Sequence, residues 1–243
     1  KASEFFHTQL VERTERVLRV AKEQGVKKAI IFGSYFSYIN NHGICGVKRG
    51  ELERHPYIKA RVEQTRRSFD LGADGFEVAV INIPYVFGVA PGKEPIWKNV
   101  FVNRFADSPK IFYGSGGSTA ISAKKIGVCT AQALELSGHG EELAVGSRNM
   151  KFTPMIERLL GEANIDKPVG SLPSWILSIA MKSQWKKAQK QDLDFGLDLR
   201  YLNGDILKRN FFVDFEATDA RLEIDYVDDV DDAMRETGER MRQ

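Results

Sequence analysis

The sequence has few cysteines, no long apolar run and little net charge, and each shortage excludes a class of protein. Only two cysteines occur among 243 residues, Cys45 and Cys129, which excludes a disulfide scaffold and a cysteine-based zinc site. No apolar run approaches the ~20 residues of a membrane span, and the N-terminus KASEFFHTQL lacks the features of a signal peptide. These shortages favour a cytoplasmic protein with reduced thiols.

The charge of the chain is nearly balanced, with 35 Lys and Arg against 33 Asp and Glu, formally +2. This balance gives no indication of nucleic acid or a membrane surface as a partner. The four histidines and two cysteines show no ligand spacing, so we predict no metal site. Hydrophobic residues make up 42% of the chain, enough for a large core.

Two segments in the first part of the chain have the apolar period of amphipathic helices. The first covers residues 3–24, with Ser3 placed as an N-cap and Gly25 where a C-terminal glycine belongs. The second runs from Pro56 to Leu71 and is followed by another glycine. We expect both helices to pack on a sheet.

Strand patterns alternate with these helices. Residues 26–34 and 76–88 are short apolar runs typical of strands that are covered on both faces, and a polar loop is expected over 35–51. Alternating helices and strands predict an α/β fold with a parallel sheet. Ser34 and Pro84 would then lie together at the carboxyl edge of the sheet, where such sheets bind ligands.

The second part of the chain differs in composition, with loops rich in glycine, proline and aromatic residues. By the family resemblance given in the next paragraph, residues 1–90 would be the C-terminal part of a dinucleotide-binding domain. Residues 91–243 should form mainly a smaller α+β substrate-binding region, with segment 110–136 returning to the sheet. The GSGGS stretch from Gly114 to Ser118 is expected to be a turn.

Four segments, in order, resemble the extended branch of the short-chain dehydrogenase/reductase family, the NAD(P)-dependent epimerase/dehydratase group. AKEQGVKKAIIFGS resembles the helix and strand that carry the family's catalytic Ser or Thr, and HPYIKARVEQ resembles the helix of its Tyr-x-x-x-Lys motif. FEVAVINIPYVFG resembles the next strand, and GSTAISAKKIGVCTAQALE a later strand and helix. The resemblance implies a Rossmann-like doubly wound parallel sheet, an NAD or NADP cofactor, a hydroxyl-bearing small molecule or nucleotide sugar as substrate, and a homodimer.

The resemblance also implies catalytic roles. In the family, a tyrosine oxygen takes a proton from the substrate hydroxyl while hydride moves to the nicotinamide. A cation one helical turn away lowers the pKa of such a phenol from its ordinary value near 10. Tyr57 is then the candidate base, and Arg61 replaces the usual lysine as its electrostatic partner. The hydroxyl that orients the substrate falls on Tyr35, or on Ser34 if the register shifts by one.

Cofactor contacts follow from the same resemblance. They fall on Gly33 at the end of the first strand, on Tyr57 and Arg61 in the helix, and on Pro84 and Tyr85 just after the second strand.

Two further residues are candidates for substrate contact. Trp97 either lines a substrate cleft or anchors a loop. His55 precedes Pro56 and is either a helix-entry residue or an acid on the active face. The plain alternative for Tyr57 and Arg61 is an ordinary pair on a helix surface.

The sequence departs from the family at its start. A glycine-rich turn that binds the pyrophosphate is expected there, and none occurs before residue 26. A sheet that began at residues 26–34 would leave one strand edge unpaired. Since the sequence does not begin with Met, we expect preceding residues in the full protein. Arg61 in place of lysine and the displaced Ser34 motivate the alternative of a non-catalytic NAD(P)-binding sensor, and the missing turn motivates that of a scaffold protein.

Overall fold

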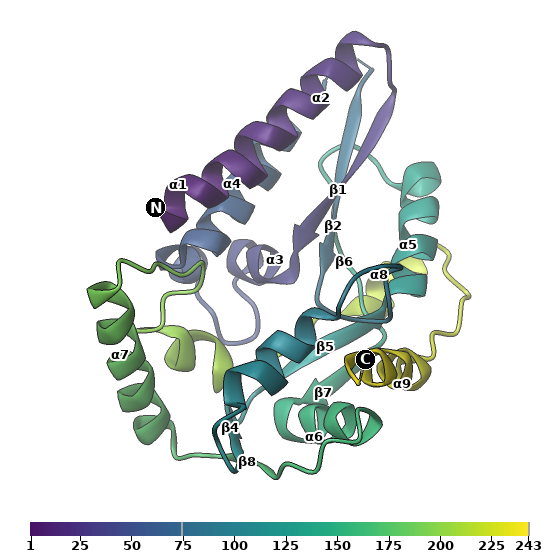
Figure 1. Cartoon of the computed structure of the whole chain (residues 1–243). Coiled ribbons are helices and arrows are strands. Elements are labelled where there is room, and N and C mark those ends of the chain that lie inside the picture. The colour runs from purple at the N-terminus through teal and green to yellow at the C-terminus, as the bar shows by residue number, and fades with distance from the viewer. Residues whose placement is uncertain (74, 243) are drawn as a thin grey trace.

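A computed structural model describes residues 1–73 and 75–242, and three parallel strands form its first sheet (Figure 1). These are β1 (Lys28–Ser34), β2 (Glu77–Ile83) and β6 (Glu142–Ala144), in the order β1-β2-β6. The strands pair in register, so Ser34 lies beside Ile83 at the carboxyl edge. The predicted parallel α/β sheet is therefore present.

Helices cover both faces of this sheet. On one face α4 (Pro56–Leu71) contacts β1 and β2, and on the other α5 (Ala123–Leu136) contacts the same strands. A long rod packs against α4 (Figure 1). It consists of α1 (Ala2–Phe6), the π-helical stretch η1 (His7–Glu12) and α2 (Arg13–Glu23). This helix–sheet–helix layering is the doubly wound arrangement that the alternation predicted.

The predicted helix boundaries are largely confirmed. The helix from Pro56 begins and ends where the sequence places it, with proline in its first turn. The rod ends at Glu23, and Gly25, two residues later, has a φ of 78°, the left-handed conformation that glycine favours. Ser3 is not an N-cap, because the helix already begins at Ala2.

The loop expected over 35–51 is wrong in its first half, where the chain forms α3 (Tyr35–His42) directly after β1. The Ser34 side chain accepts a hydrogen bond from the Phe36 N–H at 3.3 Å and so caps the helix. Gly43, with φ of 66°, ends it. A short 3-10 turn, η2 (Glu51–Arg54), leads into α4.

The apolar run over 76–88 contains two strands, and the first of them ends before Pro84, as expected. Pro84 separates β2 from β3 (Tyr85–Phe87), which belongs to a second sheet. Proline has no N–H to donate to a ladder, so a strand is interrupted where it occurs. The interruption lets one stretch of chain connect the two sheets.

The second sheet is built around β5 (Gly117–Ser122), all of whose residues are buried. Its partners are β3 and β9 (Asn210–Phe211) in parallel and β7 (Arg148–Lys151) in the antiparallel direction. A separate ribbon pairs β4 (Ile111–Tyr113) with β8 (Val169–Ser171). Of the segment 110–136, therefore, α5 packs on the first sheet, whereas its two strands belong to other sheets.

The glycine run before β5 permits close backbone packing rather than only a turn. A Cβ atom at Gly114 or Gly116 would lie 2.1 Å from the Leu207 carbonyl oxygen or 2.0 Å from that of Arg209. The backbone at Leu207 and Arg209 thus occupies the space where side chains at Gly114 and Gly116 would lie.

The remaining helices complete the α+β region in the lower half of Figure 1. They are η3 (Lys98–Val102), η4 (Asn103–Phe105), α6 (Phe152–Glu162), α7 (Ser174–Lys190), η5 (Asn203–Leu207), α8 (Phe215–Arg221) and α9 (Val230–Met241). Across the described ranges, no helix combines the length and apolarity needed to cross a membrane.

Strand β1 lies at the edge of the first sheet, with β2 as its one strand partner among the described residues. A groove of about 380 Å³ runs between this strand and α2. Its apolar lining is partly open to water, since Phe32 is 49% and Val17 64% exposed. Among the described residues, this edge of β1 therefore has no strand partner.

Candidate active site

The carboxyl edge of the first sheet brings together the end of β1 and the start of α4. Gly33 has no room for a side chain, because a Cβ atom there would lie 2.6 Å from Val80 Cγ1 and 2.7 Å from Asn82 Oδ1. Ser34 is buried, and its carbonyl accepts a hydrogen bond from the Ser37 hydroxyl at 2.6 Å. The strand end is thus held rigidly by its neighbours.

Tyr57 and Arg61 are joined to this strand end. Arg61 Nε donates to the Tyr57 hydroxyl oxygen at 3.2 Å, and Arg61 Nη1 donates to the Phe32 carbonyl at 2.8 Å. The guanidinium carbon also lies 5.4 Å from the centre of the Tyr57 ring. A pair that also bonds a strand differs from an ordinary helix-surface pair, because the sheet fixes its orientation.

Two residues that sequence reasoning missed hold Arg61 in place. Gln64 Oε1 accepts from Arg61 Nη1 at 2.8 Å, and Gln64 Nε2 donates to the Thr14 hydroxyl at 2.8 Å. Gln64 is 5% exposed. The available signal in the sequence was an amide side chain three residues after Arg61, on the same face of the helix.

Tyr35 points into the core. Its side chain is 2% exposed, and its hydroxyl oxygen accepts a hydrogen bond from Ser118 Oγ at 2.9 Å. Burial raises the pKa of the Tyr35 hydroxyl far above its ordinary value, so the group stays protonated. The structure therefore pairs Tyr35 with Ser118 and leaves Ser34 and Tyr57 at the sheet edge.

Tyr85 and Trp97 join the same aromatic cluster. The Tyr85 ring lies 4.8 Å from the Trp97 ring and 6.3 Å from the Tyr35 ring, and Trp97 Nε1 donates to the Val86 carbonyl at 2.8 Å. Burial raises the pKa of the Tyr85 hydroxyl, which is hydrogen-bonded to Tyr113. The predicted residues thus form two adjoining groups. The polar group comprises Gly33, Ser34, Tyr57 and Arg61, and the aromatic group comprises Tyr35, Tyr85 and Trp97, with Pro84 buried between the two sheets.

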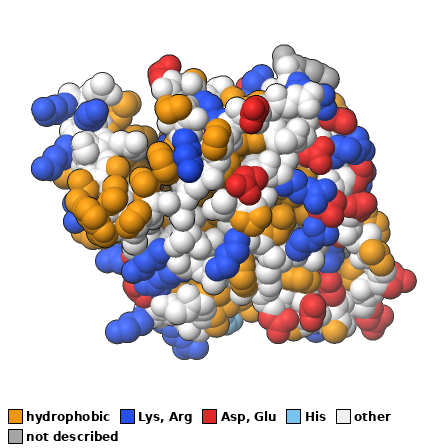
Figure 2. All heavy atoms as spheres, turned by 90° about the horizontal axis from the view of Figure 1, so that it is seen from below, with side chains coloured by type: hydrophobic (Ala, Val, Ile, Leu, Met, Phe, Trp, Pro, Cys, Tyr) orange, Lys and Arg blue, Asp and Glu red, His pale blue; other side chains and the backbone are white. Residues whose placement is uncertain are grey.

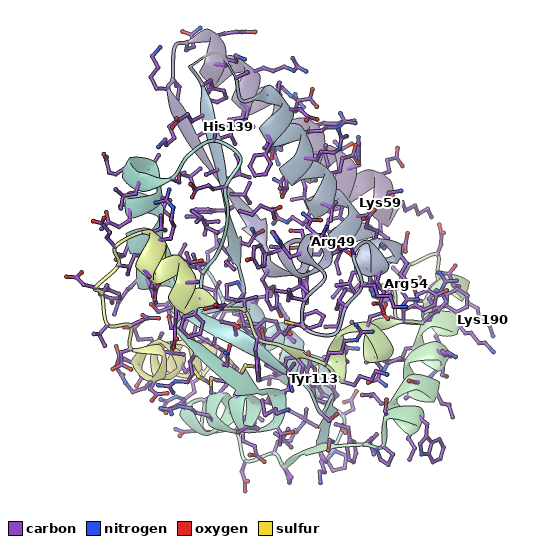
Figure 3. All side chains as sticks on the ribbon, turned by 180° about the vertical axis from the view of Figure 1, so that it is seen from behind. Arg49, Arg54, Lys59, Tyr113, His139 and Lys190 are labelled. Atoms are coloured by element: carbon purple, nitrogen blue, oxygen red, sulfur yellow. The ribbon has the colours of Figure 1, made fainter. Side chains whose placement is uncertain are left out.

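His55 lies apart from both groups. Its side chain is fully buried, and its Nδ1 accepts a hydrogen bond from the Asp198 N–H at 2.9 Å. Nε2 therefore carries the proton and donates to Asp205 Oδ2 at 2.9 Å. Arg54, labelled in Figure 3, binds the same carboxylate through two nitrogens. Both ring nitrogens of His55 are thus taken by partners distant in sequence, which sequence reasoning could not foresee.

Replacing Asp205 by asparagine is expected to lower the free energy of unfolding by about 3 kcal/mol at pH 7, since it breaks a buried charge network. Burial raises the pKa of Asp205, but hydrogen bonds from His55 and Arg54 outweigh burial and hold that pKa below its ordinary value. The stabilisation is complete above the unfolded carboxyl pKa, near 3.9, and is lost as the pH falls through the lower folded value.

Urea unfolding of D205N and the parent chain between pH 7 and pH 3 tests this prediction. The difference between their free energies of unfolding should become smaller as the pH falls. Asp70→Asn is the matched control, because this carboxylate is 60% exposed and pairs with Arg66 one turn away. A difference in the free energy of unfolding that does not change with pH would contradict the stabilising role assigned to the Asp205 carboxylate.

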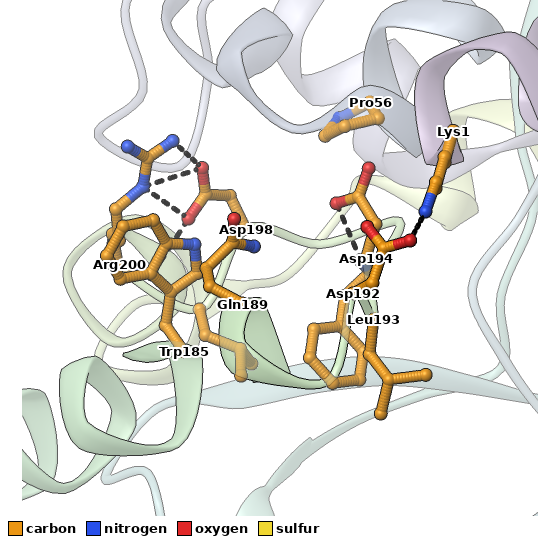
Figure 4. A pocket seen from close by; sticks show the side chains of 11 residues that line it. Lys1, Pro56, Trp185, Gln189, Asp192, Leu193, Asp194, Asp198 and Arg200 are labelled. Atoms are coloured by element: carbon orange, nitrogen blue, oxygen red, sulfur yellow. Dashed lines mark hydrogen bonds and ion pairs between the residues drawn. The ribbon is translucent and has the colours of Figure 1, made fainter. Parts of the chain in front are cut away.

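A cavity of about 470 Å³ lies next to the start of α4, between Pro56 and the end of α7 (Figure 4). Its carboxylates already have cationic or N–H partners. Asp198 pairs with Arg200, whose guanidinium lies 4.8 Å from the Trp185 ring centre, and Asp192 pairs with Lys1. The cavity therefore presents ion pairs rather than free charges. Among the residues that the structure describes, no group of His, Cys, Asp or Glu side chains is arranged to hold a metal ion.

Solved structures share this fold, although no protein-family model and no curated protein match the sequence. The UDP-glucose 4-epimerase of Thermotoga maritima, in complex with UDP-glucose, superposes with a TM-score of 0.66 at 14% identity, over 97% of this chain and 70% of that one. The UDP-N-acetylglucosamine 4-epimerase of Methanobrevibacter ruminantium gives 0.60 at 17% identity, over 94% and 67%. The dTDP-glucose 4,6-dehydratase of Bacillus anthracis, in complex with NAD, gives 0.63 at 13% identity, over 96% and 68%. These similarities confirm the predicted fold.

Proposed function

From the fold that the chain shares with nucleotide-sugar epimerases and dehydratases, we propose that it binds NAD or NADP. It would act as an oxidoreductase or epimerase/dehydratase on a hydroxyl-bearing small molecule or a nucleotide sugar. The observation that carries the proposal is the hydrogen bond between Arg61 and Tyr57 beside the end of β1. Open α/β sheets bind their ligands at this edge.

The residues at the sheet edge fit the nicotinamide end of such a cofactor. Gly33 presents backbone without a side chain, and beside it Asn82 Oδ1 is buried without a hydrogen-bond donor among the described residues. Such an orphaned acceptor is uncommon in a folded protein and suits a site that gains a partner on binding. The residues that would hold the cofactor are Gly33, Tyr57, Arg61, Pro84 and Tyr85, and the bound cofactor would supply the hydride acceptor.

Three side chains would handle the substrate proton. As the phenolate, the Tyr57 oxygen would receive it from the substrate hydroxyl, and Arg61 Nε, which bonds that oxygen, would stabilise the phenolate charge before the transfer neutralises it. Arg61 cannot pass a proton itself, because guanidinium does not deprotonate in proteins. Ser34 Oγ accepts from the Phe36 N–H, which leaves its own O–H to orient the substrate oxygen. Ser34 therefore suits this role better than Tyr35.

Removing the cation tests the proposal directly. Arg61→Leu is expected to weaken NADH or NADPH binding about tenfold and to lower turnover about a hundredfold, because charge stabilisation and positioning are both lost. Fluorescence titration and a turnover assay with a panel of nucleotide sugars measure the two effects. Arg66→Leu is the matched control on the same helix, since Arg66 is 64% exposed and pairs with Asp70. Unchanged binding and turnover in R61L would reject the assigned site.

A non-catalytic NAD(P)-binding sensor or a scaffold is the second candidate. The buried hydroxyl of Tyr35 favours it, because the residue at the family's hydroxyl position bonds Ser118 instead of facing a substrate. Saturable cofactor binding without turnover of any alcohol or sugar would support the sensor, and no saturable binding would support the scaffold.

We also propose a homodimer that uses the rod of α1 and α2 together with α4, and a cytoplasmic location. The two free thiols suit a reducing compartment. Sedimentation velocity decides the assembly, and a single monomer boundary at all concentrations would reject the dimer.

A further inference from the structure

Helix α7 is anchored by one face and turns the other to water. Its buried residues are Leu177, Met181 and Ala188. Asn203 Nδ2 fixes the first turns of the helix through hydrogen bonds of 2.8 to 2.9 Å to Ser174 and Ser178. Because these contacts fix the orientation of α7, the same side of the helix always faces away from the core.

The outer face carries a stripe of residues at helical spacing. Its members are Trp175, Ile179, Lys182, Lys186 and Lys190, which recur every three or four positions and so share one side. Trp175 is 67% and Ile179 60% exposed, although large apolar side chains are usually buried. In Figure 2, apolar side chains gather beside Lys and Arg on the lobe at the left, which is the α7 side of Figure 1.

The charge of α7 is of one sign. It contains four lysines, the three in the stripe and Lys187, and no Asp or Glu, so it carries +4 in a chain whose net charge is +2. Within the described ranges these lysines form no ion pair, whereas Lys98 and Lys124 each meet a glutamate. The helix dipole accounts for lysines in the last turn, but not for Lys182 or for the exposed indole.

We propose that the outer face of α7 binds the surface of a bilayer that contains anionic lipids. Tryptophan favours the interface between water and lipid, and lysines next to it are attracted to anionic headgroups. The contact is peripheral, and it does not depend on the proposed enzymatic function.

Vesicle flotation tests the proposal with the full chain. We expect binding to phosphatidylcholine vesicles that contain about 30% phosphatidylserine, little binding to phosphatidylcholine alone, and weakening by salt. The double variant Lys182→Glu, Lys186→Glu should bind at least about 25-fold more weakly, because each basic residue contributes about fivefold. Tryptophan fluorescence should shift to the blue on binding, and Trp175→Phe should remove this shift.

The control makes the same charge change elsewhere. Lys27→Glu with Lys93→Glu alters two exposed lysines outside α7 and should change binding by less than about threefold. Equal binding to both kinds of vesicle, or an equal loss in the control, would overturn the proposal. Binding to polyglutamate without binding to the anionic vesicles would also overturn it, and would indicate an acidic protein partner.

Discussion

Tyr57→Phe is expected to lower cofactor-dependent turnover by about a hundredfold to ten-thousandfold, the usual contribution of a positioned general acid or base. The phenyl ring keeps the packing against Phe6, whose ring centre lies 5.4 Å away, and removes the oxygen that Arg61 Nε binds. NADH affinity should change much less than turnover, because Arg61 keeps its bonds to Phe32 and Gln64. Steady-state kinetics with a parallel NADH titration separate the two quantities.

Tyr38→Phe is the matched control for that variant. Tyr38 is half-buried on α3, and its ring centre lies 4.2 Å from that of His42 rather than near Arg61. Equal turnover in Y57F, Y38F and the parent chain would exclude Tyr57 as the base. Cofactor binding that persists in Y57F alongside lost turnover would support the assignment.

Phe152→Ala is expected to lower the free energy of unfolding by about 3–5 kcal/mol, a large part of the roughly 5–15 kcal/mol of an ordinary domain. The side chain is 1% exposed, and its ring centre lies 5.2 Å from Tyr113 and 5.9 Å from Tyr85. Its removal leaves a cavity at the centre of the aromatic cluster. Urea unfolding followed by circular dichroism measures the loss.

Phe195→Ala serves as the comparison, because this side chain is 42% exposed. Its expected cost is below about 1 kcal/mol. If Phe152→Ala lowered the free energy of unfolding as little as Phe195→Ala does, the aromatic cluster would be loosely packed and would tolerate a void.

The first half of the fold could be predicted because its signals are local. Pro56 at the start of α4 and Gly25 at the end of α2 act through their own backbone, so the sequence alone places these helix ends. Helix α3 was missed because its start depends on a single capping bond, from the Phe36 N–H to Ser34, within a polar segment that resembles a loop. The break at Pro84 depends on two sheets that the sequence does not delimit.

The candidate site was predictable in part for the same reason. Tyr57 and Arg61 are one turn apart, so their contact follows from helix geometry. The direction of Tyr35 depends on Ser118, 83 residues away, and the burial of His55 depends on Asp205, 150 residues away. Contacts of that separation arise only from tertiary packing, and no local pattern encodes them.

The unpaired edge of β1 gives the chain a solution behaviour separate from its chemistry. Outward-facing amide groups of an edge strand lack ladder partners, so they should exchange hydrogen with water faster than those of the central strand β2. The same edge can template another strand, so self-association through it should rise with protein concentration. Lys27, exposed just before the strand, is the kind of charged residue that opposes such stacking. Low protein concentration should therefore limit such pairing, and high salt, which screens this charge, should promote it.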